Sequence, residues 1–383
     1  MSVSVAIIGT RGYPSYYGGF ETAVRKLAPY LADAGWDVTV YGRHGATRDH
    51  DDGRDHRVRT VVTSGIESKS LSTLSYGLTA VLHAMRSKPD VALVMNVANG
   101  FWLPLLRLRG IPVVVNVDGI EWERAKWGRL AKGIFKLAAR FTSWFGGTLV
   151  ADAAEIQRRW IQGFSRESVF IPYGGDVPGV LPVEPGLESR SYALLVARFV
   201  PENTVAEFFD AAEVLAATTK IVIVGSSGYG GLLDERAAEL ARKYENVSWL
   251  GHVSDDRRLL ALWQHAGAYF HGHSVGGTNP ALVQAMACGA PTVARDTVYN
   301  REVLGDGAKF VAPQPEAIAA AISSLLNDTE LQSSLSSTSL SRAREHYSWE
   351  LVCRLYQETL VDSISAPISR ESKRSPVAGK ANS

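Results

Sequence analysis

Short apolar runs alternate with helical patterns along nearly the whole chain. The runs are rich in Val and Ile, which is typical of parallel strands buried on both faces. Because helical patterns separate them, they predict an α/β protein with a doubly wound parallel sheet in each half. The expected strands are residues 3–8, 37–41, 91–95, 112–117 and 148–151 in the first half, and 192–197, 220–224, 247–250, 268–270, 292–294 and 309–311 in the second.

The division between the halves is marked by a segment rich in glycine and proline, residues 174–186, which has no periodicity and reads as a linker. After the second half comes one more amphipathic helical pattern. The final residues are mostly Ser, Pro, Lys and Arg, which bury little, and we expect them to be disordered. The predicted parts are a first domain at 1–174, a linker at 175–190, a second domain at 191–345, a terminal helix at 346–361 and a disordered tail at 362–383.

Composition narrows the class of protein. A chain of 383 residues usually forms two domains, and 46% hydrophobic with 21% charged residues is ordinary for a globular protein. The net charge of +1 argues against a globally basic nucleic-acid binder. Only Cys288 and Cys353 are present, so we expect no disulfide framework and a reducing compartment. We see no leader and no apolar run of roughly 18 residues, and we therefore expect a cytoplasmic protein.

The most informative segment is residues 273–291, which reads as a glycine turn opening a short helix. Thr278 or Asn279 can cap that helix, and a proline follows at a position where its missing N–H costs nothing. Gly276 and Gly277 leave backbone N–H groups bare in front of the helix dipole, which favours an anion such as a diphosphate.

A second glycine-rich loop, residues 9–22, leads from the first predicted strand into the first helix. Its length and the adjacent Gly18 and Gly19 favour a close approach to a ligand's phosphate over a plain turn.

Five segments together resemble family 4 glycosyltransferases, and specifically a bacterial rhamnosyltransferase-like branch. They are residues 9–22 (GTRGYPSYYGGFET), 116–124 (NVDGIEWER), 171–176 (IPYGGD), 196–203 (VARFVPEN) and 273–291. The resemblance implies the GT-B architecture, in which two Rossmann-like domains face each other across a cleft and a C-terminal helix crosses back to the first domain. It also implies a retaining reaction without a metal or cofactor, with a nucleotide-diphospho-sugar as donor.

The resemblance assigns donor-binding roles to the second domain. Arg198 matches the family arginine that grips the donor diphosphate, and a guanidinium suits this task because it binds phosphate bidentately and stays charged. The family's lysine five residues on is Asn203 here, so one cation is missing. The resemblance also implies two glutamates, one near the phosphate and sugar and one on the ribose hydroxyls. The first position is Gly276 here, as is normal in this branch, and the second is Gln284, which is unusual.

Three side chains near the expected cleft have open roles. Asp118 stands where many family 4 enzymes carry a histidine, and either Asp118 or Glu121 could accept hydrogen bonds from substrate hydroxyls or assist deprotonation of the acceptor. Alternatively, Asp118 only caps the following turn. His273 either contacts the phosphate or packs internally.

Residues 124–145 combine basic and apolar positions. An apolar stripe at helical spacing accompanies six cations and no acid, so this helix either docks on an anionic membrane or packs on its own domain with a solvated basic face. The cations are Arg124, Lys126, Arg129, Lys132, Lys136 and Arg140, and the stripe is Trp127, Leu130, Ile134, Leu137, Phe141 and Trp144.

The resemblance implies a retaining, metal-independent glycosyltransferase in cell-surface polysaccharide synthesis. The expected donor is thymidine-diphosphate-rhamnose, and the expected acceptor is a lipid-diphosphate-linked sugar at the inner membrane face. Two alternatives stay open: a GT-B sugar-nucleotide epimerase, and a weakly active nucleotide-sugar-binding subunit, which Asn203 and Gln284 suggest.

Overall fold

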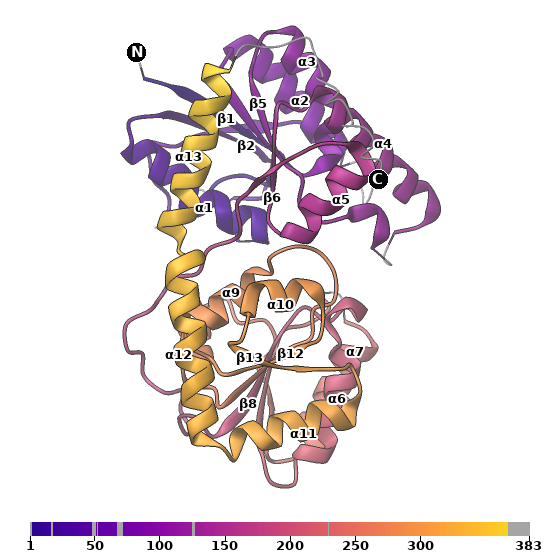
Figure 1. Cartoon of the computed structure of the whole chain (residues 1–383), viewed down its shortest axis with the longest axis vertical. Coiled ribbons are helices and arrows are strands. Elements are labelled where there is room, and N and C mark those ends of the chain that lie inside the picture. Colours follow the sequence, from indigo (N-terminus) through magenta and orange to yellow (C-terminus); the bar gives the residue numbers. More distant parts are fainter. Residues whose placement is uncertain are drawn as a thin grey trace, which may run out of the picture.

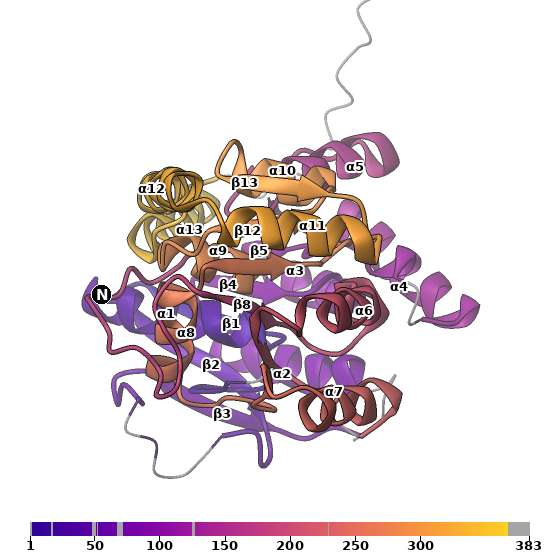
Figure 2. The same ribbon diagram turned by 90° about the horizontal axis from the view of Figure 1, so that it is seen from below.

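The computed structural model describes residues 2–16, 18–47, 51, 53–66, 72–124, 127–228 and 230–366. The described chain forms two α/β lobes stacked along the long axis, with helices on both faces of each sheet (Figures 1 and 2). The prediction of two doubly wound domains is confirmed.

The first lobe contains a parallel sheet in the strand order β3-β2-β1-β4-β5-β6-β7. Its strands are β1 (Ser4–Ile8), β2 (Asp37–Arg43), β3 (Arg59–Thr63), β4 (Val91–Met95), β5 (Val113–Asn116), β6 (Thr148–Ala151) and β7 (Val169–Phe170). Its helices are α1 (Gly19–Asp33), α2 (Ser72–Ser87), α3 (Leu103–Leu108), α4 (Arg129–Phe145) and α5 (Ala154–Phe164), with 3₁₀ turns η1 (Val97–Trp102) and η2 (Glu121–Glu123).

The second lobe repeats this plan with the strand order β10-β9-β8-β11-β12-β13. Its strands are β8 (Tyr192–Val196), β9 (Lys220–Val224), β10 (Val247–Trp249), β11 (Ala268–His271), β12 (Thr292–Arg295) and β13 (Ala308–Val311). Its helices are α6 (Val205–Leu215), α7 (Leu232–Lys243), α8 (Asp256–His265), α9 (Pro280–Ala287), α10 (Val298–Leu304), α11 (Pro315–Leu326) and α12 (Thr329–His346), with the 3₁₀ turn η3 (Pro201–Asn203).

Two strands, β3 and β7, were not predicted from the sequence, and both lie at edges of the first sheet. β3 is half exposed, and both residues of β7 are exposed, so neither has the continuous apolar pattern of a buried strand. By contrast, every residue of the central strand β4 is buried.

The chain passes between the lobes twice, at neighbouring points. The backbone N–H of Gly175 donates to the carbonyl of Tyr347 at 2.8 Å, and Gly175 forms a parallel bridge with Ser348. Beyond this point α13 (Trp349–Ser365) lies along the first lobe (Figure 1) and buries Trp349, Val352, Cys353, Tyr356 and Leu360 in its core.

The predicted end of this last helix is too early. Residues 362–365, assigned to a disordered tail, belong to α13, because Ser363 is buried and Ile364 packs against the core of the first lobe. The rest of the predicted tail, 367–383, lies outside the described residues. The predicted linker at 175–190 falls between β7 and β8.

Candidate active site

The loop between β11 and α9 lies at the carboxyl end of the second sheet, which is where ligands bind in doubly wound folds. Asn279 caps α9, because its side-chain oxygen accepts from the N–H of Ala281 at 2.9 Å, and Pro280 occupies the first turn. Thr278 has another partner: its hydroxyl donates to the carbonyl of Asp152 in the first lobe. Gly276 has φ +92°, a left-handed conformation that favours glycine.

This loop packs directly against the first lobe. A Cβ on Gly277 would overlap the carboxyl group of Asp152, which follows β6, and a Cβ on Gly119, after β5, would come within 3.2 Å of the Cα of Gly276. The carboxyl ends of the two sheets therefore face each other and approach closely at Gly119, Gly276 and Gly277.

Asp152 is the acid that the sequence analysis missed. Its side chain is 2% exposed, and its Oδ1 has no hydrogen-bond partner within the described part of the chain. Burial raises the pKa of Asp152 well above its ordinary value, and the neighbouring charge of Asp118 raises it further. Burial therefore favours the protonated form of this carboxyl group, which lies at the meeting point of the two lobes. The sequence did contain a signal for this residue, because Asp152 directly follows a predicted buried strand, and ligands bind at the carboxyl ends of such strands.

Asp118 follows β5 with φ +55°. Asn116 supports the turn that leads into Asp118, because its Oδ1 accepts from the N–H of Asp118 at 2.9 Å. The capping of the following turn by Asp118 remains a prediction. The charges of Asp118 and Asp152, after burial itself, raise the pKa of Tyr173 well above its ordinary value. Asp118 therefore lies in a group of acidic and phenolic side chains between the lobes.

Glu121 is buried and engaged within its own segment. One oxygen contacts the Nε of Arg124 at 2.7 Å, and the other accepts from Nε1 of Trp127 at 2.9 Å. This arrangement suits a residue that positions Arg124 better than one that binds a substrate hydroxyl. The role of Glu121 as an acceptor ligand remains a prediction.

Arg198, directly after β8, is exposed, and no carboxylate in the described ranges forms an ion pair with it. Asn203 is buried and fully engaged: its Nδ2 donates to the carbonyl of Arg198 at 2.8 Å, and its Oδ1 contacts Nδ1 of His273 at 2.6 Å. Burial and then the charges of Arg124 and Arg198 lower the pKa of His273 to about 4. His273 is consequently neutral at physiological pH, beside a cationic group.

Two other predicted positions are occupied by contacts within the chain. Both ends of the Gln284 amide bind the backbone of Asp176, with Oε1 accepting at 3.0 Å and Nε2 donating at 2.7 Å. At the start of α1, the carboxylate of Glu21 accepts from the N–H of Arg11 at 3.1 Å and lies beside Gly18. Gly19 faces Tyr173 and Pro280, so this loop also meets the second lobe. Phosphate binding by Gly18 and Gly19 remains a prediction.

Comparison with known proteins identifies the second half of the chain. Residues 183–342 match the family model of glycosyl transferases group 1, and residues 2–176 match a domain of unknown function, DUF1972. Residues 183–342 are a glycosyl transferases group 1 domain. The prediction of a glycosyltransferase is confirmed at the level of this domain, whereas the rhamnosyltransferase branch is not tested by the match.

Two curated proteins to which the chain is similar are mannosyltransferases. The phosphatidyl-myo-inositol mannosyltransferase of Mycolicibacterium smegmatis is 30% identical over 244 residues, covering 59% of this chain and 61% of the relative. The O-antigen chain mannosyltransferase B of Escherichia coli is 27% identical over 168 residues, covering 42% and 43%. Each match therefore spans less than two thirds of the relative.

Solved structures confirm the fold. Sucrose-phosphate synthase from Thermosynechococcus elongatus has a TM-score of 0.77 at 18% identity, with 94% of this chain and 100% of that chain covered. Anabaena HepE in complex with UDP has a TM-score of 0.71 at 17% identity, with the same coverage. The likeness at this identity concerns architecture, and it agrees with the GT-B arrangement of two facing Rossmann-like domains.

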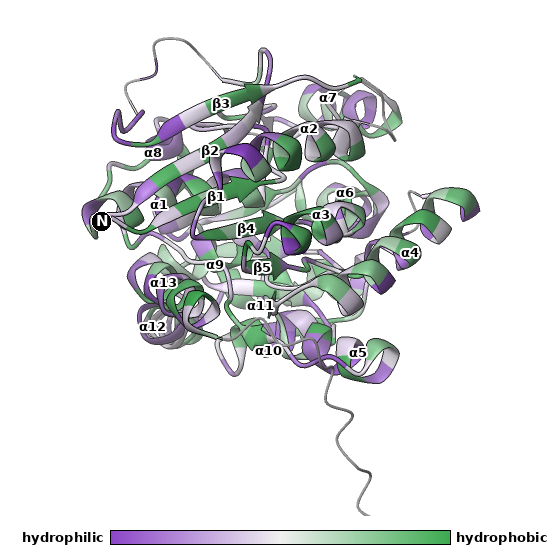
Figure 3. Ribbon diagram, turned by 90° about the horizontal axis from the view of Figure 1, so that it is seen from above, coloured by the Kyte–Doolittle hydropathy of each residue, from purple (hydrophilic) through white to green (hydrophobic). Residues whose placement is uncertain are grey.

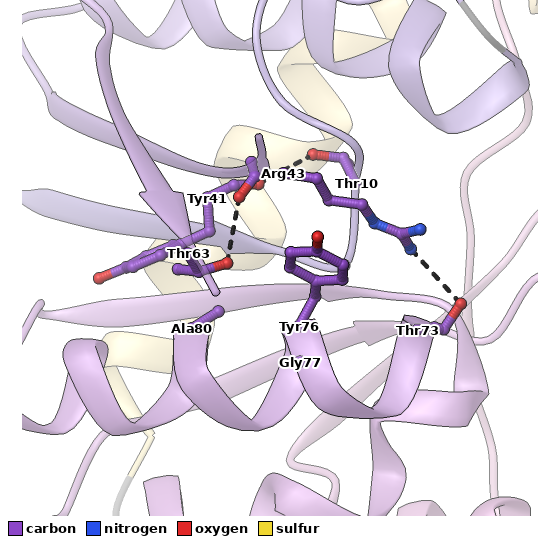
Figure 4. Close-up of a pocket in the computed structure, with 10 residues that line it drawn as sticks. Thr10, Tyr41, Arg43, Thr63, Thr73, Tyr76, Gly77 and Ala80 are labelled. Atoms are coloured by element: carbon purple, nitrogen blue, oxygen red, sulfur yellow. Dashed lines mark hydrogen bonds between the residues drawn. The ribbon is translucent and has the colours of Figure 1, made fainter. Parts of the chain in front are cut away.

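A small hollow in the first lobe lies beside the start of the glycine-rich loop (Figure 4). The ring of Tyr76 and the guanidinium of Arg43, which lies 5.0 Å from the ring centre, fill most of it. Its free volume of about 10 Å³ holds one water molecule at most, so it does not accommodate a sugar in this conformation.

Within the described ranges, no three His, Cys, Asp or Glu side chains come together as ligands for a metal ion. The helices of the same ranges include none with the length and apolar character needed to span a bilayer.

Replacing Asp152 by Asn is expected to stabilise the protein increasingly as the pH rises. The folded-state pKa of Asp152 is raised, so the unfolded chain releases this proton at a lower pH than the folded chain, and stability falls between pH about 4 and the folded-state value. Asp152→Asn cannot ionise and removes that loss. We expect the melting temperature of Asp152→Asn to exceed that of the native chain, and the difference to be larger at pH 8 than at pH 5. Each kcal/mol gained in the free energy of unfolding raises the melting temperature by about 2–4 °C.

The control for this prediction is Asp362→Asn, at an exposed position of α13. Melting curves of the three proteins at pH 5, 6, 7 and 8 give the comparison. A constant difference between Asp152→Asn and the native protein across this range would show that Asp152 does not titrate between the lobes.

Proposed function

We propose that the protein transfers a sugar from a nucleotide-diphospho-sugar to an acceptor held between its two domains. The observation that carries this proposal is the convergence of the exposed Arg198 with the glycine-rich N-terminus of α9 at the carboxyl end of the glycosyltransferase domain's sheet. Cleavage of the donor's glycosidic bond places charge on the leaving diphosphate. The N–H groups of Gly276, Gly277 and Thr278, together with Arg198, would stabilise that charge.

The proposed reaction is retaining and needs no metal. Asp118, from the facing domain, is the side chain proposed to accept a hydrogen bond from the acceptor hydroxyl and to assist its deprotonation. Burial raises the pKa of the neighbouring Asp152, and in its protonated form this carboxyl group would donate a hydrogen bond. No side chain is proposed as a covalent nucleophile.

For the donor we propose thymidine-diphosphate-rhamnose. Gln284 supports the choice of nucleotide, because its amide is used at both ends by the backbone of Asp176. A thymidine nucleotide has no ribose 2′-hydroxyl, so it needs fewer hydrogen bonds from a side chain at position 284. Since the curated relatives are mannosyltransferases, a guanosine-diphospho-mannose donor is the comparison to test.

The decisive experiment supplies purified protein with thymidine-, uridine- and guanosine-diphospho-sugars in separate reactions. Each contains a short-chain lipid-diphosphate-N-acetylglucosamine and no added metal, and both nucleoside diphosphate and lipid product are followed. Release coupled to a glycosylated lipid supports the proposal and identifies the donor. An altered nucleotide sugar without release indicates an epimerase, and nucleotide binding without turnover of any donor indicates a binding subunit; either result contradicts the proposal.

We further propose that the acceptor is presented by an anionic membrane on which α4 lies. The fully buried residues of α4 are small, including Ala138 and Ala139, and Phe135 and Phe145 also pack against the core of the first domain. Other large apolar side chains of the helix are exposed: Leu130 is 81% exposed, Leu137 50% and Trp144 57%. The helix projects from the side of the molecule (Figures 2 and 3) and carries the exposed cations Arg129, Lys136 and Arg140. Lys126, also predicted for this surface, lies outside the described residues.

Replacing Leu130 and Leu137 together by Gln is expected to weaken binding to anionic vesicles at least tenfold. Each leucine transferred from water to the bilayer contributes about 1.5–3 kcal/mol, which the amide removes. The measurement is co-sedimentation with phosphatidylglycerol-containing and purely zwitterionic vesicles. The matched control is Leu232→Gln, an equally exposed leucine (85%) on the second domain. Equal binding by the native protein and the α4 variant would contradict membrane docking through α4.

A further inference from the structure

The family that this chain resembles carries a lysine at the position of Asn203. The proposed donor site therefore has one cation fewer than is usual in that family. The structure fixes this difference, because the Asn203 amide is buried and holds both the backbone of Arg198 and the ring of His273. His273 is neutral and supplies no charge in compensation. A diphosphate carries more negative charge than Arg198 alone can balance, so a second cation from elsewhere in the fold would strengthen binding.

Arg124 reaches this place from the opposite domain. It follows η2 in the first domain, yet its Nη2 lies 3.6 Å from where a Cβ on Gly276 would stand and 3.3 Å from the corresponding point on Gly119. Its side chain is only 18% exposed. Of the three arginines whose charges lower the pKa of His273, Arg124 has the largest effect, ahead of Arg198 and Arg295.

The position of Arg124 is held by its surroundings. Glu121 contacts the Nε edge of the guanidinium at 2.7 Å, and Trp127 fixes the other oxygen of Glu121. This contact leaves Nη2 at the glycine loop that opens α9. A guanidinium that forms an ion pair with a carboxylate at one edge can present the N–H groups of its other edge to a phosphate.

We propose that Arg124 is the second cation of the donor diphosphate site, contributed by the first domain, so that the bound diphosphate bridges the two domains. This inference rests on the proposed function and adds to it a specific binding residue. It also assigns Glu121 and Trp127 as positioning residues for Arg124. The 116–124 segment then contributes to donor binding as well as to the acceptor side.

The first test measures binding without turnover. Titration calorimetry with thymidine diphosphate, thymidine monophosphate and thymidine is run on the native protein, Arg124→Met and Arg124→Lys, with uridine and guanosine diphosphates as parallel ligands. We expect Arg124→Met to weaken binding of the preferred diphosphate at least tenfold and to leave the nucleoside unchanged, with Arg124→Lys between the two. Arg86→Met, at an exposed position at the end of α2, is the control and should bind as the native protein does.

The second test asks whether the diphosphate touches both domains. Hydrogen exchange of residues 116–124 should slow on addition of the diphosphate in the native protein and not in Arg124→Met, whereas exchange of residues 276–284 should slow in both. Diphosphate affinity in Arg124→Met equal to that of the native protein overturns the inference, and a raised KM for the lipid-diphosphate acceptor alone would assign Arg124 to the acceptor. If no nucleoside diphosphate binds the native protein, the proposed function fails with it.

Discussion

Gly277→Ala is expected to lower kcat/KM at least a hundredfold. A Cβ at this position would lie less than 3.0 Å from three atoms of the Asp152 carboxyl group, closer than real Cβ atoms approach their neighbours. Asp152 is buried at the end of β6, so its carboxyl group or the loop before α9 must shift. A displacement of about 1 Å at the site where donor and acceptor meet costs on the order of a hundredfold in rate.

The structural part of this effect is measured separately. Overpacking of this kind costs about 1–3 kcal/mol of stability, and a melting curve reports it. Gly179→Ala is the control, because a Cβ there meets no atom within 4 Å. In the double variant Gly277→Ala with Asp152→Gly the overlap disappears, and the melting temperature should return toward the native value. Activity of Gly277→Ala within threefold of the native protein would mean that the two domains do not meet at this point during catalysis.

Arg198→Met should reduce kcat/KM by about a hundred- to a thousandfold, as the loss of a single preorganised donor to a developing negative charge does in other enzymes. The guanidinium is exposed near the end of β8, whereas the backbone carbonyl of Arg198 accepts from Asn203 and Val200, so removing the charged group leaves these contacts in place. Arg198→Lys keeps the charge and loses the forked geometry, and we expect it to recover part of the activity.

Steady-state kinetics with the donor identified by the assay measures these losses. The control is Arg242→Met, an exposed arginine in the last turn of α7. Unchanged melting temperatures for Arg198→Met and Arg242→Met would assign the loss to chemistry and binding. If Arg198→Met keeps more than a third of the native kcat/KM, the diphosphate does not bind at the end of β8.

The buried strands could be predicted because continuous Val and Ile runs mark a strand covered on both faces, as in β4 and β9. The edge strands β3 and β7 could not, since exposed strands lack that pattern. The end of α13 depended on a buried face formed with the other end of the chain, to which no local pattern refers.

The candidate site was predictable where a motif stands at the end of a strand, as with Arg198, Gly276 and Gly277. It was not predictable where two domains meet. Asp152 becomes notable only because Gly277 packs on its carboxyl group, and Arg124 only because it reaches Gly276 across the interface. The amide of Gln284 illustrates the converse: sequence resemblance directed it to a ribose, and the structure gives both of its ends to the Asp176 backbone.

The placement of α13 has a consequence for the order in which the protein folds during synthesis. The core of the first domain includes residues of α13, namely Trp349, Val352, Tyr356 and Leu360. This last helix of the core is synthesised only after the whole second domain. Domains usually fold in the order in which they are made. Here the sheet of residues 4–170 emerges first and is completed last, so the newly made first domain keeps an uncovered apolar face while the glycosyltransferase domain folds behind it.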